Sequence, residues 1–264
     1  MLDLLKWQMQ CSPREWSKII FAMLVKTNAI VISTVKYGDS SLITRCYCKE
    51  LGLKSFMLKG ILTSKKGGLK KSLFQPLNLI NISTQIKNQS NQKLNFIREG
   101  SLKVHFKEIP LKIKKNAIAL FISEVISRVI YEEGNPNIAL YSFLENSIMK
   151  LEKDQFSPVF HLKFLTLLSD QLGFYPNLMC QEKEFFDIES GCFCENSNSK
   201  YAVGGETVRA FKELLGINFD DIVQIKISNT LRIKVLDFLI DYFNIHLPRF
   251  GKIKSIAVLH EIFH

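Results

Sequence analysis

The chain has 264 residues, 47% of them hydrophobic and 23% charged, with a formal net charge of +10. This composition supplies enough apolar residues for folded cores and excludes an intrinsically disordered class of protein. Charged residues interrupt every apolar run long enough for a membrane span, and they also interrupt the N-terminal region where a secretion signal needs an apolar core, so we expect a cytoplasmic protein.

The basic excess lies in the first two fifths of the chain. Residues 1–100 contain 16 Lys+Arg and 5 Asp+Glu, a net charge of +11, whereas residues 101–264 contain 19 and 20, a net charge of −1. A basic domain beside a neutral one is expected to meet a polyanion. A solvated basic surface without a specific partner is the alternative.

Residues 23 to about 100 show the patterns of short strands. The segments are β-branched or alternate between polar and apolar residues, and Gly-containing turns separate them. They cover residues 29–35, 41–48, 53–59 and 77–84. Four or five short strands at this spacing predict a small β-barrel.

After Leu94 the apolar spacing changes from about two residues to about 3.6, which predicts helices. The expected helices cover residues 117–126, 138–153, 160–173, 206–215, 229–244 and 255–263, and residues 177–203 form a polar, turn-rich insert. We therefore predict an α+β protein of several domains, with an N-terminal β-barrel, a helical domain and a short irregular insert.

Segments in a fixed order along the chain resemble the RecO family. They are AIVI (29–32), YGDSSLI (37–43), ELGLK (50–54), LKG (58–60), LFQPL (73–77), LLSDQLGFYP (167–176), YFNIHL (242–247) and KS (254–255). No single segment is specific, and the resemblance rests on their order and spacing between residues 23 and 264. Residues 1–22 lie outside the pattern as an N-terminal extension, so Met23 is an alternative start to Met1.

The resemblance implies an OB-fold DNA-binding domain at residues 23–100 and a helical domain at 101–264, with a zinc-finger-like insert at about 177–203. It implies a mediator of DNA repair and homologous recombination rather than an enzyme. Such a protein binds single- and double-stranded DNA and anneals complementary strands. Its implied partners are RecR and the acidic C-terminal tail of the single-stranded-DNA-binding protein, with which it helps place RecA on coated DNA.

The segment from residue 54 to residue 71 contains six lysines and no acidic residue. Lysine is a flexible point charge, which suits contact with backbone phosphates better than reading of bases. An OB fold combines such charges in a groove with aromatic side chains on which bases stack. The candidate DNA-binding residues are therefore Lys54, Lys59, Lys65, Lys66, Lys70 and Lys71, with Arg45 and Lys36 as weaker candidates. Tyr37 and Tyr47 are available for stacking, and Phe56 and Phe74 are expected in the core.

The insert contains Cys180, Cys192 and Cys194. A structural zinc site uses four ligands, usually as two Cys-x-x-Cys pairs. Here Lys183 stands where the first pair would be completed, and the second pair is one residue too close. We therefore expect a degenerate zinc finger without metal, and no cofactor.

Two other functions remain as alternatives. The last residues, His260-Glu261-Ile262-Phe263-His264, match the H-E-x-x-H pattern of zinc hydrolases, although a third ligand normally follows downstream. The general OB-fold resemblance also fits a protein associated with RNA or the ribosome.

Other charged groups are expected to be ordinary surface features. The carboxylate pairs Asp220/Asp221 and Asp237/Asp241 are typical of solvated faces and turns rather than of a nuclease site. Basic residues near the end of the helical part are candidates for receiving an acidic, aromatic peptide tail beside an apolar groove, although helix-surface charge is the simpler interpretation. They are Lys226, Arg232, Lys234, Arg249, Lys252 and Lys254.

Overall fold

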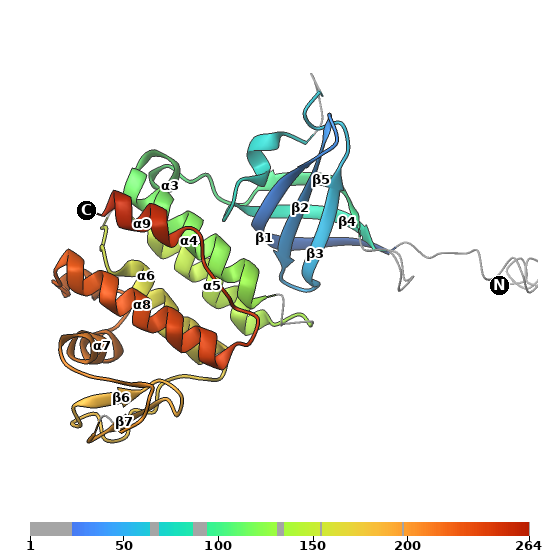
Figure 1. The fold of residues 1–264 in the computed structure, drawn as a ribbon. Coiled ribbons are helices and arrows are strands. Elements are labelled where there is room, and N and C mark those ends of the chain that lie inside the picture. The colour runs from blue at the N-terminus through green and yellow to red at the C-terminus, as the bar shows by residue number, and fades with distance from the viewer. Residues whose placement is uncertain are drawn as a thin grey trace, which may run out of the picture.

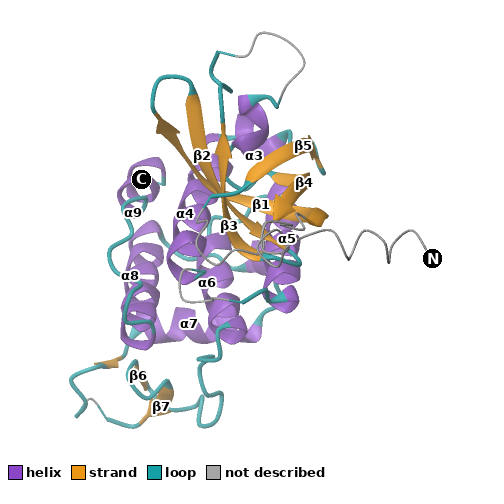
Figure 2. Cartoon of the chain, turned by 90° about the vertical axis from the view of Figure 1, so that its right-hand side faces the viewer, coloured by secondary structure: helices purple, strands orange, loops and turns teal. Residues whose placement is uncertain are grey.

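The computed structural model describes residues 23–63, 69–86, 94–130, 135–153, 155–196 and 198–263. An N-terminal sheet lies beside a layer of helices (Figure 1), and a small second sheet lies at the end of the molecule opposite the first (Figure 2). The expected extension at residues 1–22 and the candidate residues Lys65 and Lys66 fall outside the described residues.

Five strands form the N-terminal sheet in the order β3-β2-β1-β4-β5, and every neighbouring pair is antiparallel. They are β1 (Met23–Tyr37), β2 (Ser41–Cys48), β3 (Gly52–Leu58), β4 (Leu79–Ile86) and β5 (Phe96–Leu102). The four segments expected as strands all lie in this sheet.

The sheet is not closed into the predicted barrel by a continuous ladder. The edge strands β3 and β5 meet at one parallel bridge between Phe56 and Asn95. There the amide of Met57 donates to the carbonyl of Asn95 at 2.8 Å, and the amide of Asn95 donates to Ser55 at 2.9 Å. Pairing stops at this point because β3 ends at Leu58, whereas β5 runs from Phe96 away along β4.

The helical spacing expected after Leu94 is wrong for the segment Phe96–Leu102, which is strand β5. Its alternation is broken in two places. The register slips between Ser83 and Thr84 of β4, which leaves Arg98 as an extra residue, and Gly100 supplies no side chain to the pattern. Such a bulge turns two successive side chains to one face and hides the period of two from the sequence.

The inner side of the sheet forms a separate core. Buried side chains include Val31, Cys46, Ile80 and Phe56, and the short helix η1 (Lys71–Phe74) adds Leu73 and Phe74. The expectation that Phe56 and Phe74 belong to the core is confirmed, since their side chains are 0% and 2% exposed.

The helical part contains α3 (Glu108–Leu111), α4 (Ile113–Val129), α5 (Ile138–Glu152), α6 (Phe160–Gln171), α7 (Glu206–Gly216), the short η2 (Ile222–Gln224), α8 (Asn229–His246) and α9 (Ile256–Ile262). Each helix expected from the apolar spacing is present, within a few residues of its expected ends. None of the helices in the described residues combines the length and apolarity needed to cross a bilayer.

The outer side of the sheet joins the core of the helices. Ile30, Ile32, Tyr47 and Leu79 belong to the same buried cluster as the inward faces of the helices. The Ser123 hydroxyl of α4 also donates to the carbonyl of Ile32 at 2.6 Å. The sheet and the helices are therefore packed as neighbouring layers over one shared core.

The insert after α6 contains a three-stranded sheet in the order β7-β6-β8. Its strands are β6 (Phe185–Asp187), β7 (Cys192–Cys194) and β8 (Ala202–Val203). Phe186 contacts the rings of Phe211 and Phe238 at centroid distances of 5.3 and 5.7 Å, so the insert is fixed to α7 and α8 by aromatic packing.

Candidate nucleic-acid interface

Three of the predicted lysines lie exposed around the end of β3 and the start of η1. Lys59 directly follows β3, while Lys70 and Lys71 stand at the start of η1. Among the described residues, none of these three ammonium groups makes a salt bridge. Unpaired, exposed cations of this kind remain available to backbone phosphates.

Lys54 and Arg45 occupy different positions. Lys54 is half-buried and pairs with Cys46, so the register puts it on the side of the sheet that carries Phe56. The guanidinium of Arg45 donates to the Ser127 hydroxyl of α4 at 3.3 Å. The structure therefore places Arg45 between sheet and helices, apart from the exposed lysines.

The aromatic side chains divide between core and surface. Tyr47 is fully buried, contacts the ring of Tyr141 at 6.2 Å and donates to the carbonyl of Asn137. Tyr37 and Phe96 are 55% and 45% exposed, and the Lys59 ammonium lies 5.1 Å from the centre of the Phe96 ring.

Phe96 was missed by the sequence analysis because its strand was not recognised. An exposed aromatic ring beside an unpaired lysine provides the two contacts used for single strands, stacking on a base and attraction of a phosphate.

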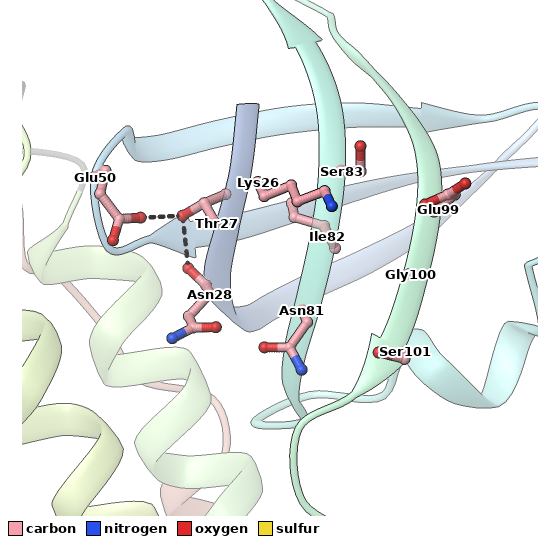
Figure 3. A pocket seen from close by; sticks show the side chains of 10 residues that line it. All are labelled: Lys26, Thr27, Asn28, Glu50, Asn81, Ile82, Ser83, Glu99, Gly100 and Ser101. Atoms are coloured by element: carbon pink, nitrogen blue, oxygen red, sulfur yellow. Dashed lines mark hydrogen bonds between the residues drawn. The ribbon is translucent and has the colours of Figure 1, made fainter. Parts of the chain in front are cut away.

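Three hollows adjoin one another across β5. The first lies on the outer face of β1, β4 and β5, where Lys26, Ser83 and Glu99 form one row across the strands, and Asn28, Asn81 and Ser101 form the next (Figure 3). The second lies between η1 and β5 and includes Lys70, Arg98 and His105. The third lies between η1 and the helices, where Phe106, Pro110 and Leu120 line it.

The β2–β3 turn is tied to the rim of the first hollow. The Thr27 hydroxyl donates to the Glu50 carboxylate at 2.5 Å, as the dashed line in Figure 3 marks. Glu50 and Glu99 balance Lys26 here, so this hollow is polar without being basic.

The cysteines of the insert are not brought together as a metal site. Cys192 and Cys194 lie on β7, and each thiol is directed to a backbone carbonyl, that of Ser190 or Asn196, at 3.4 Å. Cys180 is exposed in the preceding turn, at a positive φ of 59°. Among the residues that the structure describes, no three His, Cys, Asp or Glu side chains form a group suited to a metal ion.

The histidine of the H-E-x-x-H pattern that can be placed, His260, faces the interior. It lines a small cavity with His161 and Arg232, between α6, α8 and α9. Burial, with the positive charges of Arg232 and His260 nearby, lowers the pKa of His161 to about 3. The position of His264 lies outside the described residues.

The two carboxylate pairs lie in different surroundings, which shift the pKa of one member of each pair in opposite directions. Asp220 bonds to Lys150, and this hydrogen bond and charge lower its pKa. Burial raises the pKa of Asp237.

Among the basic candidates of the C-terminal part, Arg232 on α8 is 8% exposed, bonds to Asn229 and donates to the carbonyl of Phe263 at 3.1 Å. Its charge is therefore used inside the fold. Lys226, Lys234, Lys252 and Lys254 are exposed.

Family models match nearly all of the described chain. The model described as Recombination protein O N terminal matches residues 23–106, and the model described as Recombination protein O C terminal matches residues 110–255.

Curated relatives cover the same region. The DNA repair protein RecO of Christiangramia forsetii is 34% identical over 241 residues, that of Flavobacterium psychrophilum is 35% identical over 241, and that of Bacteroides fragilis strain YCH46 is 35% identical over 246. Each alignment spans 91% of this chain and 100% of the relative.

Proposed function

This chain belongs to the RecO family of DNA repair and recombination proteins, and from that premise we propose that it is a non-enzymatic recombination mediator. It binds single- and double-stranded DNA and anneals complementary strands. Together with RecR it helps load RecA onto single strands coated by the single-stranded-DNA-binding protein.

The observation that carries the DNA-binding part is the group of exposed cations on the sheet. Lys59, Lys70 and Lys71 have no ion pair within the described part of the chain, and Lys59 lies against the exposed ring of Phe96. Lys65 and Lys66 are close to these lysines in the sequence and belong to the proposed set. Lys54 is half-buried and Arg45 contacts Ser127, so we assign these two a smaller part in the contact. These charges suit contact with the DNA backbone without a preference for sequence.

Fluorescence anisotropy with labelled oligo-dT over a salt series tests this proposal. The variant Lys59→Ala/Lys70→Ala/Lys71→Ala is compared with Lys226→Ala/Lys234→Ala/Lys252→Ala, which removes the same charge from exposed positions elsewhere. Each lost phosphate contact makes the dependence of log K on log salt shallower by roughly 0.7. We expect the first variant to show this change and the control to keep the wild-type slope. Equal slopes in all three proteins would contradict the proposed site.

The proposed contact with the acidic tail of the single-stranded-DNA-binding protein has a suitable surface beside α3 and α4. Leu111 and Ile113 are 79% and 69% exposed and line a hollow with Phe156. Lys112 and Lys114 border the same hollow. Apolar side chains flanked by lysines fit a short tail that is both acidic and apolar.

Binding of a labelled tail peptide separates this function from that of an RNA- or ribosome-associated protein. We expect Ile113→Ser to weaken the peptide complex at least fivefold, whereas Val223→Ser, at a position 42% exposed, serves as the control and leaves it unchanged. Absence of any peptide binding by the wild-type protein would argue against the mediator function and in favour of the RNA-associated alternative.

A further inference from the structure

The surface that usually binds single strands in an OB fold is partly closed in this protein. In OB folds the face of the second and third strands, with the adjoining loops, receives the nucleic acid. Here Arg45 of β2 contacts Ser127 of α4 at 3.3 Å, and the Tyr47 hydroxyl contacts the carbonyl of Asn137 at 3.2 Å. A strand that reaches the exposed lysines must therefore continue in another direction.

The hollows across β5 offer that direction. The first and second share Glu99, Gly100 and Ser101 as lining residues, and the second and third share Ser72, Leu102 and His105. The three adjoining hollows, here called the β5 groove, extend from the polar outer face of the sheet to its junction with the helices.

Arg98 is directed into this groove by the β-bulge. Ser83 pairs with Glu99 and Thr84 pairs with Ile97, so Arg98 has no partner in the ladder. Ile97 lies in the inner core at 9% exposure, whereas Arg98 is exposed and lines the second hollow. Bulges often re-aim a side chain in this way beside a functional site.

Gly100 brings a second cation to the same place. A Cβ atom at Gly100 would lie 2.9 Å from a methyl carbon of Leu73 and 3.1 Å from one of Leu69. The absence of a side chain lets the segment around η1 lie directly against β5. Lys70, next to Leu69, therefore lines the same hollow as Arg98.

The charge of this hollow remains positive. It contains Lys70 and Arg98 against the single carboxylate of Glu99, with the exposed imidazole of His105 on the same wall. Neither Lys70 nor Arg98 forms a salt bridge within the described ranges. A guanidinium can bind a phosphate through two parallel hydrogen bonds, which a lysine cannot do.

We propose that the β5 groove is a binding path for single-stranded DNA, with Arg98 and Lys70 holding a backbone phosphate where the strand turns from Lys59 and Lys71 toward the helices. This inference rests on the proposed DNA-binding function and adds to it a residue, Arg98, and a direction. The strand crosses the edge of the sheet at β5 and does not cover the outer face of β2.

Anisotropy with labelled oligo-dT tests the phosphate contact through Arg98→Ala, Arg98→Lys and the matched control Arg209→Ala, an exposed arginine on α7. A slope change of roughly 0.7 corresponds to about fivefold weaker binding at 0.1 M salt. We expect this loss for Arg98→Ala, a smaller loss for Arg98→Lys because the charge remains, and wild-type binding for Arg209→Ala. Circular dichroism of each variant shows whether the fold is intact.

The path is tested by cross-linking from a photoreactive phenylalanine analogue placed at Asn116 or at Arg209. Asn116 lines the third hollow, beyond Arg98, and is exposed. We expect DNA to cross-link from position 116 and not from position 209.

The inference fails if Arg98→Ala binds as tightly as Arg209→Ala, or if position 116 gives no more cross-link than position 209. In either case tight binding by the wild-type protein, weakened at Lys59 and Lys71, leaves the proposed function standing. Absence of wild-type binding would remove the proposed function itself.

Discussion

The exposed cations beside the N-terminal sheet differ in their surroundings from two buried cations in the helices. Arg98 of β5, Lys59 after β3 and Lys70 at the start of η1 are exposed, and the described residues offer them no salt bridge. In the helices, Lys115 and Lys163 are each 2% exposed, and their ammonium groups donate to backbone carbonyls. The difference indicates which charges are available to a polyanion and which hold the fold. Changes at the buried cations of the helices and at their partners are expected to affect stability, and changes at the exposed cations beside the sheet are expected to affect DNA binding.

The largest effect is expected from Glu152→Ala, at the end of α5. Its carboxylate accepts from the amides of Lys107, Glu108 and Ile109 at 2.5, 2.9 and 3.0 Å. Burial raises the pKa of Glu152, but these three hydrogen bonds and the nearby charge of Lys115 lower it by more, so the carboxylate is held in its charged form. Losing these contacts is expected to reduce the free energy of unfolding by about 3 kcal/mol.

Urea denaturation at pH 7 measures this change. The control, Glu213→Ala, removes an exposed carboxylate from α7 and is expected to change stability by less than about 0.5 kcal/mol. A similar loss of unfolding free energy in the two variants would show that the three hydrogen bonds accepted by Glu152 do not stabilise the fold.

A second effect concerns pH and comes from His161. In the unfolded chain the imidazole of His161 is protonated near pH 6.5. In the folded chain burial lowers its pKa, and protonation occurs near pH 3. The unfolded state thus binds more protons between these values, so stability falls as the pH falls through that window. The loss is expected to be about 2 kcal/mol between pH 7 and pH 5.

Denaturation curves at pH 7 and pH 5 test this for the wild type, His161→Gln and the surface control His105→Gln. We expect the pH-dependent loss to shrink by about 2 kcal/mol in His161→Gln and to persist in His105→Gln. Equal pH dependence in all three would place the titrating group elsewhere.

Gly100→Ala is expected to reduce both the stability of the protein and its affinity for DNA. The added methyl group meets the side chains of Leu73 and Leu69 and is expected to cost about 1 kcal/mol, because these side-chain ends can move. Moving the segment around η1 also shifts Lys70, so the salt dependence of DNA binding becomes shallower. Gly216→Ala, where no atom lies within 4 Å of the added carbon, is the control for both measurements.

The smallest change in stability is expected for Lys59→Ala/Lys70→Ala/Lys71→Ala. These side chains are exposed, so the free energy of unfolding should change by less than about 0.5 kcal/mol, while the slope of log K for DNA falls by up to roughly 2. A loss of stability comparable to that of Glu152→Ala would contradict the division between the two layers.

Most elements of the fold were predictable because their periodicity is local. The β-branched run around Ile30 and the helical spacing around Phe121 each show in a short window of sequence. Strand β5 was missed because the bulge at Arg98 and the bare position at Gly100 disturb the alternation. The extent of closure between β3 and β5 depends on the path of Asn95 and not on any pattern within either strand.

The candidate site was only partly predictable for a different reason. The run of lysines indicates a basic segment, but the direction of a side chain depends on which layer covers the strand. Arg45 is one residue from buried Cys46 and points toward α4, which the sequence around it does not reveal. Phe96 and Arg98 are candidate DNA-binding residues because the fold brings β5 next to Lys59 and Lys70, which are distant from it in sequence.

The shared core beneath β1 has a mechanical consequence. The outer side of the sheet is apolar at Ile30, Ile32, Tyr47 and Leu79, where the helices pack against it. A fragment ending near residue 106 would expose these side chains to water and is expected to aggregate. Because the sheet and the helices share this core, a partner that binds the helices also sets the direction of the β5 groove. The angle at which a bound strand is presented to that partner is then fixed by the packing of β1 on α4.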